Sequence, residues 1–127
     1  MGLIISGFLG DLINVISNSA GKFSAARDIS AAQGYFAGGN YLQALDEYKK
    51  ALGKIQPSDK KLLAQVKNNM ALCVFQTALD NKDVKGMKDS LPMFEESLSL
   101  YKEAGDTESI KQVERNISEV KRQVKGF

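Results

Sequence analysis

The segment AAQGYFAGGNYLQALDEYKKAL, residues 31–52, decides the fold. Two runs of helix-favouring residues lie on either side of Gly38-Gly39-Asn40, a break in which Asn40 is a good N-cap for the second run. Apolar side chains then recur at helical spacing, at Tyr41, Leu45, Tyr48, Leu52 and Ile55. The segment therefore predicts two helices joined by a tight turn.

The next part of the chain shows the same kind of pattern. Pro57-Ser58 forms a break, and we expect Ser58 to cap a following helix. The apolar stripe of that helix is Leu62, Leu63, Val66, Met70, Cys73, Val74 and Ala78. A further stripe consists of Val84, Met87, Leu91, Phe94, Leu98 and Tyr101. Pro92 lies inside it and either kinks one helix or starts a second one capped by Ser90.

The C-terminal part predicts one more helix. Gly105 ends the preceding helix as a C′ glycine, and Asp106 or Thr107 caps the last one. Its stripe is Ile110, Val113, Ile117, Val120 and Val124. No run shows strand alternation, and the breaks are short. The sequence therefore predicts an all-α fold of five helices in successive antiparallel helix-turn-helix pairs.

Composition narrows the possible chemistry. The chain has 127 residues, a formal charge of +2, no histidine and one cysteine, Cys73. Without histidine it lacks the commonest general base and metal ligand, and one cysteine cannot form an internal disulfide or a CxxC site. We expect no metal, no cofactor and no small-molecule substrate. The balanced charge also argues against nucleic acid as a partner.

Residues 1–22 differ sharply from residues 23–127, and we place the domain boundary between them. The first 21 residues contain one charged side chain, Asp11. Projected on a helix, eight apolar residues fall on one broad face. They are Ile4, Ile5, Phe8, Leu9, Leu12, Ile13, Val15 and Ile16. This amphipathic segment is too short to span a bilayer, and we expect its apolar face to contact a membrane surface.

The first residues, MGLIIS, fit the pattern for N-myristoylation, with Gly2 as the acylation site. One acyl chain gives only marginal membrane binding, so a second signal is needed. No Lys or Arg precedes Lys22, and the apolar face would supply that signal. The stretch MGLIISGFLGDLI resembles the leader of Arf-type small GTPases, in which an acylated glycine precedes a membrane-inserting helix. No P-loop follows, so the GTPase activity does not carry over.

Residues 25–124 resemble the tetratricopeptide repeat family, whose unit is a helix-turn-helix of about 34 residues. The matching positions of the first repeat are Tyr35, Gly39, Tyr41, Ala44, Tyr48, Ala51 and Leu52. A weaker second copy comprises Asn69-Met70-Ala71-Leu72-Cys73 and then Phe94, Ser97 and Leu98. The resemblance implies about two repeats and a capping helix. A microtubule-interacting-and-trafficking domain shares the GNYxxALxxYxxAL pattern, but its third helix usually carries an Arg-Ala-Glu pattern that is missing here.

Members of this repeat family often hold an acidic peptide C-terminus with Lys, Asn and Arg side chains. The resemblance implies that Asn69, Lys111 and Arg115 are peptide-binding residues. Lys111 and Arg115 are one helical turn apart and could meet a carboxylate together. The corresponding first-repeat positions hold Ile29 and Gln33, so the full clamp is not present.

Three classes of function are compatible with these patterns. The leading hypothesis is a non-catalytic adaptor that binds a protein or peptide partner and is held on the cytoplasmic face of a membrane by the acylated leader. The second is a soluble co-chaperone-like or assembly module. The third is a structural subunit of a larger complex, and in both alternatives residues 3–17 would be a core or interface helix. An enzyme is the least favoured class, because adjacent carboxylates such as Glu95 and Glu96 diverge on a helix.

Overall fold

The computed structural model describes residues 20–127, with side chains from Ala25 onward. Its helices are α2 (Ala20–Ala37), α3 (Tyr41–Leu52), α4 (Lys60–Asp80), α5 (Val84–Asp89), α6 (Leu91–Ala104) and α7 (Thr107–Lys125). No strand occurs within residues 20–127, so the all-α prediction is confirmed for this part of the chain. Helix α2 begins at Ala20 and crosses the predicted boundary at residue 22. The predicted leader helix and its residues lie outside the described side chains.

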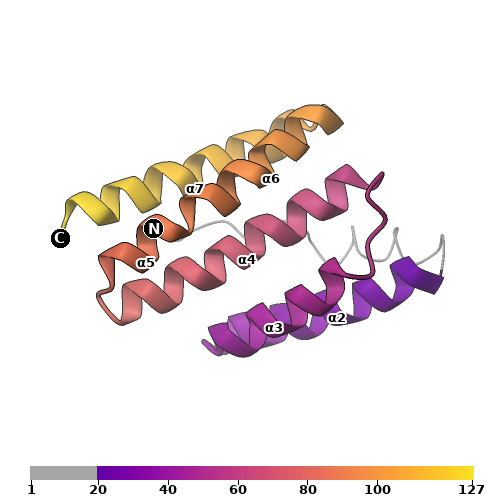
Figure 1. Cartoon of the computed structure of the whole chain (residues 1–127), viewed down its shortest axis with the longest axis horizontal. Coiled ribbons are helices and arrows are strands. Elements are labelled where there is room, and N and C mark those ends of the chain that lie inside the picture. The colour runs from indigo at the N-terminus through magenta and orange to yellow at the C-terminus, as the bar shows by residue number, and fades with distance from the viewer. Residues whose placement is uncertain (1–19) are drawn as a thin grey trace.

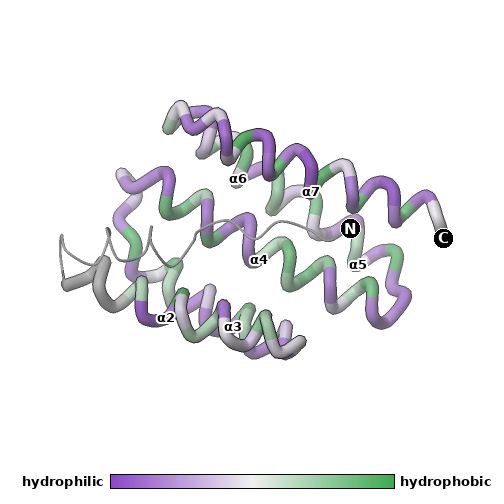
Figure 2. Tube along the Cα trace, turned by 180° about the vertical axis from the view of Figure 1, so that it is seen from behind, coloured by the Kyte–Doolittle hydropathy of each residue, from purple (hydrophilic) through white to green (hydrophobic). Residues whose placement is uncertain are grey.

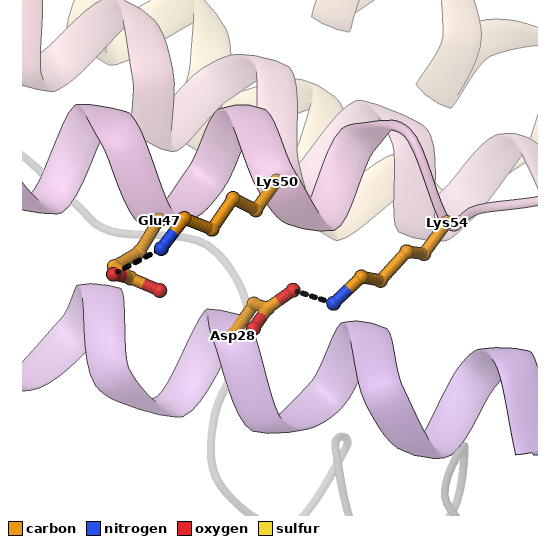
Figure 3. A network of polar contacts seen from close by, with 4 residues as sticks. All are labelled: Asp28, Glu47, Lys50 and Lys54. Atoms are coloured by element: carbon orange, nitrogen blue, oxygen red, sulfur yellow. Dashed lines mark hydrogen bonds and ion pairs between the residues drawn. The ribbon is translucent and has the colours of Figure 1, made fainter.

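Helix α4 lies at the centre of the described part of the molecule (Figure 1). Helices α2 and α3 pack together on one side of it, and α5, α6 and α7 lie on the other. Two ion pairs on the α2–α3 surface are shown in Figure 3: Asp28 with Lys54 at 2.7 Å, and Glu47 with Lys50 at 3.2 Å. The Asp28–Lys54 pair joins the middle of α2 to the second residue after the end of α3. Such exposed pairs contribute little to stability, so apolar packing must hold these helices together.

Ion pairs and a buried hydrogen bond show in which direction α6 and α7 run relative to α4. Lys60 pairs with Glu103 at 2.9 Å, and Lys67 pairs with Glu96 at 3.5 Å. Residue numbers rise along α4 as they fall along α6, so these two helices are antiparallel. Helix α7 runs parallel to α4, because Lys61 lies against Asp106 and Asn68 lies further along against Asn116.

The core consists of two clusters that share α4. The first joins α2 and α3 to one side of α4 and includes Ala25, Ala26, Ile29, Ala32, Ala44, Tyr48, Ala51, Ile55, Leu62, Val66, Met70 and Cys73. The second joins the other side of α4 to α5, α6 and α7 and includes Ala64, Ala71, Leu72, Phe75, Ala78, Met87, Phe94, Tyr101, Val113, Ile117 and Val120. Figure 2 shows hydrophobic and hydrophilic residues alternating along α7, as expected for a helix with one buried side.

The helix boundaries confirm most of the predicted breaks and correct one cap. The N-cap of α4 is Asp59, whose carboxylate accepts a hydrogen bond from the Leu62 N–H at 3.3 Å, and not Ser58. The carboxylate is better placed because it directly precedes the helix. Asp106 caps α7 by accepting from the N–H of Ser109. Gly105 ends α6 in the left-handed conformation, with φ of 70°, as predicted.

Pro92 begins a second helix, which decides between the two alternatives that the sequence allowed. Helix α5 ends at Asp89, and Pro92 lies in the first turn of α6, where its missing N–H costs no helical hydrogen bond. Ser90 occupies the N-cap position, as predicted, but its hydroxyl donates back to the Met87 carbonyl at 2.6 Å and makes no cap hydrogen bond to α6.

A close contact between α4 and α5 requires a glycine. A Cβ at Gly86 would lie 2.6 Å from a carboxylate oxygen of Asp83 and 2.9 Å from the Cβ of Ala78. The Asp83 carboxylate cannot move away freely, because it caps α5 by accepting from the Gly86 N–H at 3.0 Å. Gly34 in α2 differs, since nothing lies within 4 Å of a Cβ placed there.

We predict that Gly86→Ala lowers the free energy of unfolding by about 1–3 kcal/mol, through overpacking against Ala78 and disturbance of the Asp83 cap. The matched control, Gly34→Ala, should raise it by about 0.5–1 kcal/mol, because alanine favours helix where there is room. Urea unfolding followed by circular dichroism measures both. Equal midpoints for the two variants would contradict the close contact.

Candidate functional site

An open groove of about 780 Å³ lies between α4 and α6. Helix α4 lines it with Leu63 and Lys67. Helix α6 supplies the rest of the lining: Leu91, Pro92, Glu95, Glu96, Ser99, Leu100 and Glu103. The apolar members are all half-buried apart from the exposed Pro92. The groove is therefore a furrow with an apolar floor that solvent reaches.

Helical spacing explains why these side chains share one furrow. Leu63 and Lys67 are one turn apart on α4, and the α6 residues recur every three or four positions. The two helices approach closely beside the groove, where the Ser97 hydroxyl donates to the Ala64 carbonyl at 2.7 Å. Both residues are small and buried, so the longer side chains next to them form the two walls.

The rim of the groove carries an excess of negative charge. Three carboxylates, Glu95, Glu96 and Glu103, face one lysine of the lining, Lys67. Lys67 pairs with Glu96 at 3.5 Å, and Lys60 pairs with Glu103 at 2.9 Å from just outside the lining. Glu95 has no ion pair within residues 20–127. The furrow therefore combines apolar surface with acidic edges.

The three predicted peptide-binding residues differ in their exposure. Lys111 and Arg115 are exposed on α7, one turn apart as predicted. Asn69 is only 1% exposed and lies inside the domain on α4. The described structure therefore does not bring the three side chains together on one surface.

Asn69 belongs instead to a row of buried side-chain amides that connects α4 to α7. The Asn68 amide donates to the Asn69 side-chain oxygen at 3.2 Å, and the Asn116 amide of α7 donates to the Asn68 oxygen at 3.1 Å. All three side chains are fully buried. Buried amides cost free energy unless they are paired, so this row fixes the position of α7 on α4.

Tyr48 and Cys73 lie next to the amide row and are too buried to serve as reactive groups. Burial raises the pKa of the Tyr48 hydroxyl far above its usual value, and the neighbouring Cys73 raises it further. The Asn69 side-chain amide lowers this pKa by a smaller amount. Burial raises the pKa of Cys73 to about 12. The interpretation of Cys73 as a small buried hydrophobic residue is confirmed.

Two smaller hollows adjoin each other around Leu42, with volumes of about 260 and 210 Å³. Thr77 and Asn81 of the α4 end line both of them. Leu42 is 61% exposed. The lining of the first hollow is mostly polar, whereas Leu42, Leu45, Val74 and Ala78 make the lining of the second largely apolar. Both hollows are much smaller than the α4–α6 groove.

Sequence reasoning missed the groove because its two walls come from segments about thirty residues apart. Glu95 and Glu96 were weighed only as an acid–base pair, and Leu100 lay outside the predicted stripe. A signal was present in the run from Leu91 to Glu103. Beside the buried stripe it carries a second row of leucine and glutamate at helical spacing, which indicates a partly exposed apolar face.

Within residues 20–127, no cluster of three or more acidic or cysteine side chains is arranged to hold a metal ion. In the same part of the chain, no helix has a stretch that is both apolar and long enough to cross a membrane. The predicted lipidation site Gly2 and the predicted membrane-contact residues lie outside the described residues.

We predict that Cys73 in the folded protein reacts with a thiol reagent about a thousandfold more slowly than in urea, because its pKa of about 12 leaves little thiolate at pH 8 and its sulfur is buried. Absorbance of released thionitrobenzoate measures both rates. Labelling of the folded protein at the unfolded rate would show that the α3–α4 interface opens readily.

Comparison of the chain with protein-family models, with curated proteins and with solved structures finds no match. The resemblance to tetratricopeptide repeats therefore stays a prediction from the sequence.

Proposed function

We propose that the protein is a non-catalytic adaptor with a tetratricopeptide-like helical body that holds a segment of a protein partner in the α4–α6 groove. The proposal includes a tether at the cytoplasmic face of a membrane, formed by myristoylated Gly2 and the apolar face of the leader. The observation that carries it is the open groove with an apolar floor between α4 and α6.

The dimensions of the groove fit a protein segment. From Pro92 to Glu103 the α6 wall rises about 16 Å, or about three helical turns. A furrow of this length that is open to solvent suits a helix or an extended peptide lying along it, since small-molecule sites usually enclose most of their ligand. Half-buried leucines on the floor would supply the apolar contact.

The membrane part of the proposal is supported by the sequence of the leader. Gly2 is followed by three uncharged residues and then Ser6, and one broad face of the predicted helix is apolar. An acyl chain and an apolar face together provide the two signals that stable membrane attachment needs. Because no basic residue precedes Lys22, attachment should depend on apolar burial and not on anionic lipid.

One feature of the body favours the alternative, a soluble module or subunit in which the leader packs against protein. The outer side of α2 exposes Ala31, Gly34 and Ala37, which are small and uncharged, and Tyr35 is 40% exposed. A second helix could approach this side closely. The behaviour of the body without residues 2–17 separates the two proposals.

We predict that the chain co-expressed with an N-myristoyltransferase loses Met1 and gains one myristoyl group by intact mass. The acylated protein should float with neutral liposomes about equally at low and high salt, because apolar burial drives the attachment. Gly2→Ala is the matched control and should float much less.

Deletion of residues 2–17 should abolish flotation and leave the thermal midpoint of the body almost unchanged. Failure of acylation, or flotation that falls steeply with salt, would contradict the tether. A large loss of stability in the deletion variant would instead favour the alternative in which the leader completes the core.

To test the groove, helical peptides are selected from a phage-displayed random library for binding to the full-length protein. We predict that these peptides no longer bind the Ser99→Trp variant. Ser99 is exposed on the groove wall, so a tryptophan there occupies the furrow without removing a core contact. Ser118→Trp, at an exposed position on α7, is the matched control and should bind normally. Peptides whose affinity is unchanged by Ser99→Trp would place the binding surface elsewhere.

A further inference from the structure

The chemistry of the α4–α6 groove also specifies the kind of segment that fits it. We propose that the groove binds a cationic amphipathic helix, with leucine-like side chains on its floor and lysine or arginine side chains along its acidic edge. This inference rests on the proposed protein-binding function of the groove and adds the chemistry of the partner.

The charge of the groove is opposite to that of the whole chain. The chain has a formal charge of +2, whereas the groove lining has three carboxylates and one lysine. Even with Lys60 included, which pairs with Glu103, acidic groups remain in excess. A cationic segment is therefore attracted to the groove and not to the surface in general.

The acidic groups lie where the side chains of a bound helix would reach them. Glu96 and Glu103 are seven residues apart on α6, which places them about 10.5 Å apart along the helix axis, with Glu95 at the same end as Glu96. Basic residues about two turns apart on a helix lying along α6 would meet this spacing. The exposed edge therefore matches a repeated basic pattern.

The apolar floor of the groove explains why the bound helix must also have an apolar face. Leu63 from α4 and Leu91 and Leu100 from α6 are half-buried, so each still presents part of its side chain to the furrow. A peptide that covered this floor would bury apolar surface on both molecules. A charged segment without an apolar face would leave the floor exposed and would gain only the screened ion pairs of the rim.

The sequence predicts a site for an acidic peptide at Lys111 and Arg115, whereas the groove would bind a basic partner on different helices. Those residues are exposed on α7, and neither lines the groove. An acidic partner at α7 and a basic partner at α4–α6 can thus be separated by peptides of opposite charge and by variants on the two helices.

The test uses two labelled peptides of about 14 residues, about four helical turns, with the same leucine pattern and either lysine or glutamate at every polar position. Fluorescence anisotropy with the full-length protein measures Kd for each. We expect the leucine–lysine peptide to bind at least about tenfold more tightly than the leucine–glutamate peptide, and its Kd to rise with salt.

Variants then locate the site. The triple variant E95Q/E96Q/E103Q should raise the Kd of the leucine–lysine peptide about tenfold or more, because it removes the acidic edge. The matched control D46N/E108Q/E114Q removes three exposed acidic groups outside the lining and should change Kd little, as should K111A/R115A. Equal urea midpoints for the variants and the parent protein show that each variant is folded.

The remaining outcomes separate failure of this inference from failure of the proposed function. Tighter binding of the leucine–glutamate peptide that is lost in Ser99→Trp would overturn the cationic partner and keep the groove as the binding site. Absence of binding by both peptides, or binding of the lysine peptide that neither Ser99→Trp nor the triple variant changes, would overturn both.

Discussion

Burial of α4 on two opposite sides is the constraint on which the rest of the described structure depends. One side packs against α2 and α3 through larger residues such as Leu62 and Met70. The other side carries Ala64, Ala71 and Ala78 at intervals of seven, and these small residues allow close approach. Ser97 meets Ala64 and Gly86 meets Ala78 along this row. Helices α5 and α6 are therefore held near the α4 backbone, and the Asn68–Asn116 hydrogen bond sets α7 beside them.

The groove follows from the same close contact. Where Ser97 touches the α4 backbone, the neighbouring Leu63, Lys67, Glu96 and Leu100 extend from the edge of the interface and cannot pack fully against one another. The result is a furrow whose floor is apolar and whose rim is charged. It is formed by rigid helices and not by loops, so its shape exists before any partner binds, which lowers the cost of binding.

The sequence predicted the helices well because local signals determine them: apolar spacing, Gly38-Gly39, Gly105 and the Asp106 cap. It predicted mainly one face of α4, because Leu62, Val66, Met70 and Cys73 of the stripe face α2 and α3. Of the second face, the stripe contained Ala78 but not Ala64, Ala71, Leu72 or Phe75. Asn69 was assigned to a surface by family resemblance, whereas its burial depends on Tyr48 and Asn68 from the folded context. The groove requires the α4–α6 register, which no local pattern contains.

Methyl NMR of the full-length protein titrated with the leucine–lysine peptide locates the bound peptide directly. We expect the largest shift changes at Leu63, Leu91 and Leu100, which line the groove, and almost none at Val124 on α7 or Leu42 on α3. Changes concentrated on α7 near Lys111 and Arg115, or around Leu42, would contradict the central claim that the α4–α6 furrow is the binding surface.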